Sequence, residues 1–146
     1  MGYYMRYIAV DEREITLPLL ESALKQIDPA YAIVDVLGES GALTCSGELY
    51  GLIEVNRPGD GLFDEELDAL EEFLEEAHRE GRATVLETLH NARAIVAVQV
   101  LWQGRETEDT MSKLDPLWDW LPANRQGLLR VDGEGYYDNS RLILAE

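Results

Sequence analysis

The stretch A94-I-V-A-V-Q-V-L-W102 is a nine-residue run that is apolar except for Gln99 and rich in β-branched side chains. Runs of this kind are typical of strands buried inside a sheet. This predicted strand decides the fold, because it completes a regular order of strands and helices that begins at the N-terminus.

Five elements precede this strand, and their periodicity separates strands from helices. They are strands over residues 3–10, 31–37 and 42–56, and amphipathic helices over residues 16–28 and 64–80. Thr16 is the expected N-cap of the first helix. The segment 42–56 is long for one strand, and Gly47 and Gly51 suggest a bulge or a break into two strands. Residues 83–92 are expected to continue as a second short helix.

The order strand, helix, strand, strand, helix, strand is the split βαβ pattern (βαββαβ) of the ferredoxin-like superfold. We therefore expect an α+β protein with a ferredoxin-like core over residues 1–102. A helix and an antiparallel strand meander over residues 103–146 would pack on that core as an extension. No repeat or change of composition requires a second domain, so the chain 1–146 is predicted to be a single domain.

The extension contains two proline signals and a turn-rich segment. Pro116 predicts an interruption of the helical piece that begins near Thr107. Asp115 and Pro116 would be the N-cap and first position of a separate short helix, which Pro122 ends. The segment R130-V-D-G-E-G-Y-Y-D138 contains Asp-Gly, a strong hairpin signal. It predicts a three-strand meander over residues 126–144.

Charge is the most pronounced property of the composition: 29 acidic residues oppose 12 basic ones, giving a net charge of −17 at pH 7. Residues 64–92 hold nearly half of this excess. Such a surface repels phosphate backbones and anionic lipids, so no nucleic acid and no membrane is expected as a partner. It attracts a basic protein or divalent cations. The alternative is that the acidic helix only solvates the protein.

The sequence contains no signal peptide pattern, no apolar run near 18 residues and a single cysteine, Cys45, so a soluble cytoplasmic protein is expected. It also contains no nucleophile–base pair, cofactor fingerprint or phosphate loop, and no cofactor is predicted. Enzymatic activity is left open, although its absence is favoured. The oligomeric state is open as well, a homodimer included.

Both histidines lie three residues after a glutamate, in E75-E-A-H78 and E87-T-L-H90. Glu-x-x-His places a carboxylate and an imidazole on one helix face, and two such pairs form part of the ligand set of di-iron carboxylate proteins. The alternative hypothesis is therefore a metal-binding protein or small metal-dependent enzyme that uses Glu75, His78, Glu87 and His90.

The favoured hypothesis is a non-catalytic protein-binding module that engages a basic partner, and neutralisation in the manner of an immunity protein is its specific version. Exposed aromatic residues anchor protein interfaces. Trp118 fits the inward face of its helix, which leaves Trp120 partly exposed. Tyr136 and Tyr137 are adjacent in a strand and should point to opposite faces. The candidate binding residues are Trp120, Tyr136, Tyr137, Glu72 and Glu76.

Overall fold

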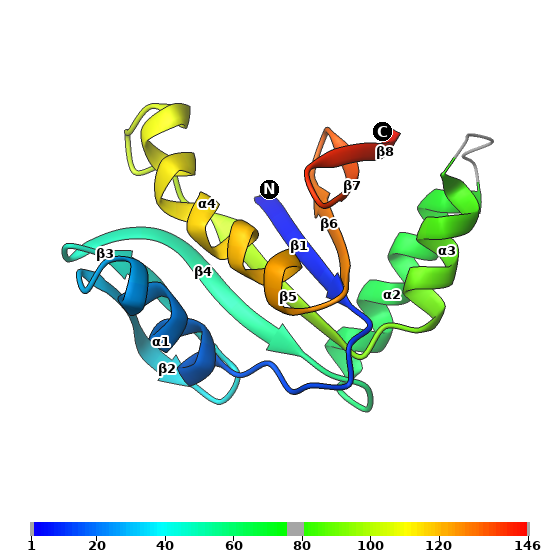
Figure 1. Ribbon diagram of the computed structural model, residues 1–146, viewed down its shortest axis with the longest axis horizontal. Helices are drawn as coiled ribbons and strands as arrows, with labels where there is room; N and C mark the ends of the chain where they lie inside the picture. Colours follow the sequence, from blue (N-terminus) through cyan, green and yellow to red (C-terminus); the bar gives the residue numbers. More distant parts are fainter. Residues whose placement is uncertain (1, 76–80, 146) are drawn as a thin grey trace.

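The computed structural model describes residues 2–75 and 81–145, and for residues 73–75 the backbone alone (Figure 1). The strands are β1 (Tyr3–Ala9), β2 (Tyr31–Leu37), β3 (Ser40–Cys45), β4 (Glu48–Asn56), β5 (Ala94–Val100), β6 (Gly127–Val131), β7 (Gly135–Asp138) and β8 (Arg141–Ala145). The helices are α1 (Leu17–Ile27), α2 (Gly61–Glu75), α3 (Arg82–His90) and α4 (Thr107–Asn124). The chain is thus a mixed α+β protein, as predicted.

All eight strands form one antiparallel sheet in the order β2-β3-β4-β5-β1-β6-β7-β8. The N-terminal strand β1 therefore lies between β5 and β6, two strands that are distant in the sequence. The strand predicted from the run at 94–102 is β5, and six of its seven residues are buried. Its burial on both faces explains why its sequence does not alternate.

A ferredoxin-like core is not confirmed, because the sheet order differs. In the ferredoxin-like pattern the first strand would lie between the third and the fourth strands. Here β5 lies between β4 and β1, and it pairs with β1 in register from Tyr3↔Val100 to Ala9↔Ala94. The segment 42–56 also breaks at Ser46–Gly47 into β3 and β4, which adds one strand to the predicted pattern. Strands β2, β3 and β4 then follow one another in the sheet, and β5 joins β4 to β1 instead of lying at the edge beside β1.

Helices cover both faces of the sheet (Figure 1). On one face α1 and α4 pack on a large apolar cluster that includes Leu20, Leu24, Val96, Val98 and Leu117. On the other face α2 and α3 pack on a smaller cluster. The connection from β5 to β6 passes through α4 and crosses over β1, which places α4 above the centre of the sheet.

The positions of helices α1, α2 and α3 largely agree with those predicted from the sequence. The Leu19 N–H donates to Oγ1 of Thr16 at 3.2 Å, which confirms Thr16 as the N-cap of α1. Helix α2 begins at Gly61, three residues before the predicted start, and α3 confirms the predicted second short helix. No helix in the described part of the chain is long and apolar enough to cross a membrane.

The predicted break at Pro116 is wrong, because α4 is one helix that contains both Pro116 and Pro122. A proline inside a helix costs about 3 kcal/mol. Leu114, Leu117 and Leu121 are completely buried against the sheet, and each buried leucine contributes about 1.5–3 kcal/mol. The apolar face of α4 therefore outweighs the proline penalty and keeps the helix continuous.

The predicted meander is confirmed as β6, β7 and β8, with a turn at Asp132–Gly133. Tyr136 is buried in the smaller cluster, whereas Tyr137 packs against the larger one on the opposite face. Gly127 allows β6 to approach β1, since a Cβ at this position would lie 2.1 Å from the Ile8 carbonyl oxygen.

Replacing Pro116 with alanine should raise the free energy of unfolding by about 1–2 kcal/mol, because the new N–H can donate to the carbonyl four residues earlier. The matched control is Pro18→Ala in the first turn of α1, where a proline is tolerated and little change is expected. Chemical denaturation measures both variants. Equal stabilities would show that Pro116 causes no strain in α4.

Candidate functional site

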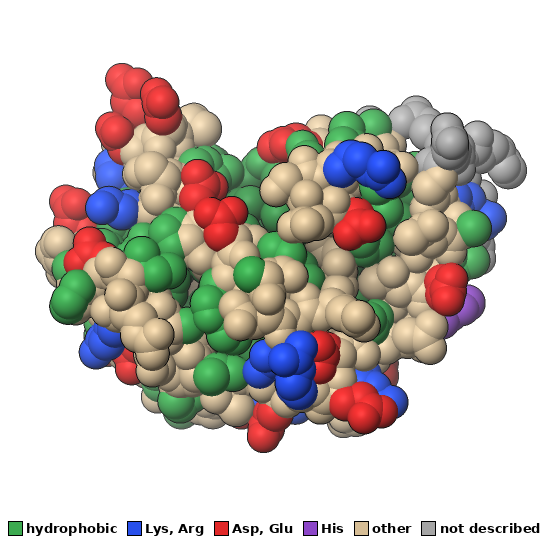
Figure 2. All heavy atoms as spheres, in the orientation of Figure 1, with side chains coloured by type: hydrophobic (Ala, Val, Ile, Leu, Met, Phe, Trp, Pro, Cys, Tyr) green, Lys and Arg blue, Asp and Glu red, His purple; other side chains and the backbone are tan. Residues whose placement is uncertain are grey.

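A solvent-open groove of about 330 Å³ lies between α4 and the β6–β8 meander, and we name it the α4–β7 groove. Figure 2 shows it as a hollow with hydrophobic side chains inside and acidic side chains on its sides. Its lining consists of Met5, Tyr7, Met111, Asp115, Trp118, Asp119, Pro122, Leu129, Val131, Glu134, Tyr137, Asn139 and Ser140.

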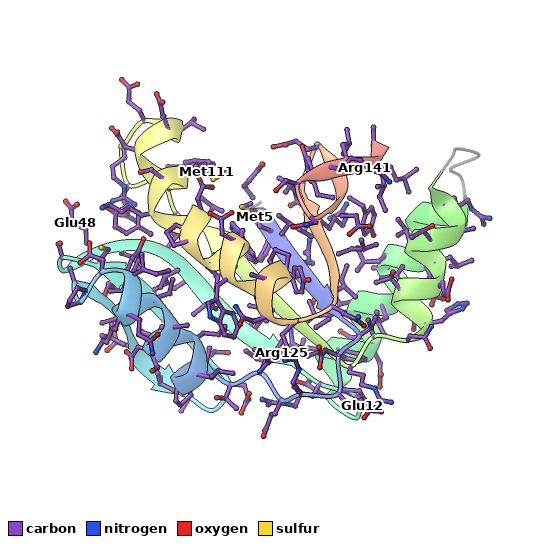
Figure 3. All side chains as sticks on the ribbon, viewed as in Figure 1. Met5, Glu12, Glu48, Met111, Arg125 and Arg141 are labelled. Atoms are coloured by element: carbon purple, nitrogen blue, oxygen red, sulfur yellow. The ribbon has the colours of Figure 1, made fainter. Side chains whose placement is uncertain are left out.

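The sheet order creates this groove. Because α4 crosses over β1, one of its faces is left opposite the turns of the meander, and β1 and β6 form the floor between them. Figure 3 shows Met5 of β1 and Met111 of α4 in the space between these two elements. Methionine side chains are flexible and polarisable, so this floor adapts to the shape of a ligand.

Three carboxylates surround the groove, and no Lys, Arg or His residue is among its described lining residues. Asp115 and Asp119 lie one turn apart on α4, and Glu134 projects from the β6–β7 turn on the other side. Partial desolvation raises the pKa of Asp115, and the negative charge of Asp119 raises it further. The three carboxylates are exposed, and no basic side chain among the lining residues pairs with them.

Tyrosine hydroxyls hold the carboxylate of Glu134 in place. Tyr137 Oη donates to Oε1 at 2.6 Å, and Tyr3 Oη donates to Oε2 at 3.2 Å. Burial and the charge of Glu134 raise the pKa of Tyr3 to about 12, and the hydrogen bond to Glu134 raises the pKa of Tyr137. The tyrosines stay protonated at neutral pH, so they orient Glu134 without neutralising its charge.

Trp118 forms an apolar part of the groove wall and carries an unusual polar group. The side chain is 6% exposed, as expected for the inward face of α4. Its indole Nε1–H is buried, and no described residue accepts a hydrogen bond from it. A buried donor without an acceptor destabilises a protein by about 1–3 kcal/mol.

The residues that the sequence predicted for partner binding lie in different parts of the fold. Tyr137 lines the groove. Tyr136 is buried in the smaller cluster and presents no surface to a partner. Trp120 is half-buried beneath the Arg125 guanidinium, which lies 5.5 Å from the ring centre, and it does not line the groove. Glu72 is exposed on α2, and Glu76 lies outside the described residues.

The residues of the metal hypothesis are only partly described. Glu87 and His90 are exposed on α3, and His90 Nε2 lies 3.3 Å from Oε1 of Glu71. The side chain of Glu75 and all of His78 lie outside the description. Within the described residues, no group of three or more His, Cys, Asp or Glu side chains could hold a metal ion. The paired Glu-x-x-His site stays a prediction.

Sequence reasoning missed the acidic residues of the groove. The sequence predicts Asp115 as a helix cap and Glu134 as part of a turn, and it does not predict that the two lie near each other. The spacing of Asp115 and Asp119 was an available signal, because like charges four residues apart share one helix face and repel each other. Glu134 gave no such signal, since only the sheet order brings it opposite α4.

A second hollow of about 490 Å³ lies over the part of the sheet that α2 and α3 leave bare. Its lining includes Leu37 and Leu52, which are 85% and 45% exposed. The adjoining edge of β2 is partly closed, because the Ile33 N–H donates to Glu21 at 2.6 Å. The hollow is therefore an apolar surface beside a protected sheet edge, with fewer charged groups than the α4–β7 groove.

Comparison of the chain with protein-family models, with curated proteins and with solved structures finds no match. The chemistry of the groove must therefore be inferred from its own side chains. Three carboxylates offer hydrogen-bond acceptors and negative charge, and the aromatic walls offer π-faces. This combination suits a positively charged organic group.

Replacing Asp119 with asparagine should lower the pKa of Asp115 toward its ordinary value of 3.8, because one cause of the upward shift is removed. With a raised folded-state pKa, stability falls as the pH rises through the interval between the unfolded and folded values. The variant should therefore be slightly more stable than the parent at neutral pH.

Carboxyl carbon NMR titration measures the pKa of Asp115 directly. Asp68→Asn, an exposed position on α2 with the same change of charge, is the control and should leave that pKa unchanged. If both variants shift the pKa equally, the repulsion between Asp115 and Asp119 is not the cause.

Proposed function

We propose that this protein is a non-catalytic binding module that engages a basic protein through the surface around the α4–β7 groove. The observation that carries the proposal is the lining of the groove, which has three carboxylates and no basic residue. The net charge of −17 supports it, because complementary charge accelerates encounter with a basic partner. Neutralisation of a basic toxin, as by an immunity protein, is the specific version of this function.

The predicted residues divide into two roles under this proposal. Tyr137, which lines the groove, is a direct contact residue. Glu72 lies on α2, which packs on the opposite face of the sheet, so its acidic surface acts over distance. Trp120 is exposed enough to contribute at the edge of an interface but lies outside the groove lining.

Two variants with the same change of net charge test this division. The groove variant is Asp115→Asn/Asp119→Asn/Glu134→Gln, and the matched control on α2 is Glu65→Gln/Asp68→Asn/Glu72→Gln. Long-range attraction should weaken equally in both. Direct contacts should be lost in the groove variant alone, so its affinity for a basic partner should fall about tenfold or more, since truncating a buried charge contact costs at least that much.

The measurement is capture of partners from a lysate of the source cells at low salt, followed by affinity measurement on each captured basic protein. A partner that fits the proposal dissociates when salt is raised and binds the α2 control far better than the groove variant. If nothing basic is captured, or if both variants bind equally, this function of the groove is wrong.

A further inference from the structure

We propose that Glu21 keeps the outer edge of β2 closed and so prevents this edge from pairing with the β2 edge of a second copy of the chain. The inference is independent of the proposed function, because none of the described residues that line the α4–β7 groove belongs to α1 or β2. Three observations carry it: the place of β2 in the sheet, the hydrogen bond that Glu21 accepts, and the exposed apolar residues of the same strand.

Strand β2 lies at the edge of the sheet and has a neighbouring strand, β3, on one side only. The Ser46 N–H donates to the Ala30 carbonyl at 3.0 Å, so the backbone groups of Ala30 face β3. Because successive residues of a strand direct these groups to opposite sides, those of Tyr31 and Ile33 point away from β3. Outward N–H groups at a sheet edge are a template on which another strand can pair.

Both outward N–H groups have an acceptor within the chain. The Tyr31 N–H donates to the Asp28 carbonyl at 3.1 Å, in the turn that joins α1 to β2. The Ile33 N–H donates to Oε2 of Glu21 at 2.6 Å. Glu21 belongs to α1, which packs beside β2 (Figure 1), and its carboxylate takes the place of the carbonyl oxygen of an added strand. Hydrogen bonds to a charged acceptor are about twice as strong as neutral ones, so Glu21 competes well with such a strand.

The strand beside this contact has the composition of a self-pairing segment. Val34, Val36 and Leu37 are 39%, 53% and 85% exposed. Residues 31–37 are rich in β-branched side chains and contain one charge and no proline, a pattern typical of segments that pair with their own copies. Antiparallel pairing of β2 with β2 gives both copies the same contacts, as a two-fold axis requires. A bulge between Val34 and Leu37 limits the regular edge to a few residues, so the pairing is weak.

The opposite edge of the sheet, β8, is closed in a different way. A Cβ at Gly81 would lie 2.0 Å from the Ile143 carbonyl oxygen, so the start of α3 lies directly against this strand. Natural sheets cover their edges because uncovered ones associate. At β8 the cover is the backbone of a neighbouring helix, whereas at Ile33 it is one side chain, so a single substitution at Glu21 opens the β2 edge.

The first test is amide hydrogen exchange of Ile33, followed by NMR in dilute solution. Glu21→Ala should speed this exchange about tenfold or more, since it removes a hydrogen bond to a charged group. Glu21→Gln keeps an acceptor oxygen, and Ser22→Ala changes the exposed neighbour on α1, so both should stay within a few-fold of the parent. The Val98 amide, at the centre of the sheet, serves as the correction for any change in overall stability.

The second test is sedimentation velocity at physiological salt, where repulsion between the acidic copies is screened over about 8 Å. At protein concentrations up to the millimolar range, the mass of Glu21→Ala should rise with concentration, while the parent, Glu21→Gln and Ser22→Ala show no such rise. Glu21→Ala/Val36→Lys should reverse the association, because a lysine on an edge strand opposes pairing. Glu21→Ala/Leu62→Lys, with the lysine at a similarly exposed position on α2, should still associate.

The proposal is overturned if Ile33 exchanges equally fast in Glu21→Ala and in the parent, because Glu21 then does not close the edge. It is also overturned if the exchange quickens without association, or if Val36→Lys and Leu62→Lys affect the association equally. If Glu21→Ala folds poorly, Glu21→Ser, whose side chain is too short to reach Ile33, takes its place under the same criteria. The groove variant and its α2 control test the proposed function separately, so either idea can fail alone.

Discussion

The fold depends on the pairing of β1 with two strands that the chain reaches much later. Seven residues of β1 pair with β5, and five of them pair with β6 on the other side. Neither pairing is local, so the centre of the sheet cannot close until residues 94–131 are in place. The same requirement defines the α4–β7 groove, because β1 supplies part of its floor and the β5–β6 connection supplies α4.

The charges of the groove contrast with those elsewhere in the chain. Arg6 forms ion pairs with Glu66 and Asp132, and Arg57 forms ion pairs with Glu14 and Glu39. In the groove, two aspartates share a helix face with no base among the lining residues, and an indole N–H lacks an acceptor. Unfavourable local arrangements of this kind persist where binding requires them, since a stability optimum would remove them.

The sequence predicted local structure well and long-range structure poorly, for a physical reason. Hydrophobic periodicity and turn residues act within a few residues, and they located β5, α3, the cap of α1 and the meander. The sheet order depends on which distant strands pair, and the position of β5 between β4 and β1 has no local signal. The continuity of α4 depended on packing of its apolar face, which outweighs Pro116 but cannot be measured before the sheet beneath it is known.

In the candidate site too, local features were predictable from the sequence and long-range contacts were not. Alternation along β7 predicted that Tyr136 and Tyr137 face opposite sides, and helical spacing predicted that Trp118 faces inward; the structure confirms both. The approach of Glu134 to Asp115 and Asp119 was unpredictable, because it arises from the sheet order. The missing acceptor of Trp118 is likewise a property of the assembled fold and has no sequence signal.

The separation of the acidic α2 surface from the groove implies a division between the rate and the lifetime of binding. If the protein binds a basic partner as proposed, the exposed carboxylates on α2 would attract any basic protein without selecting one, and this attraction would be short-ranged because charges are screened over about 8 Å at physiological salt. Contacts that a bound partner made inside the groove would be desolvated on binding, so they would act mainly on dissociation. Under the proposed function the high net charge would promote encounter, and selectivity would come from the few side chains that line the α4–β7 groove.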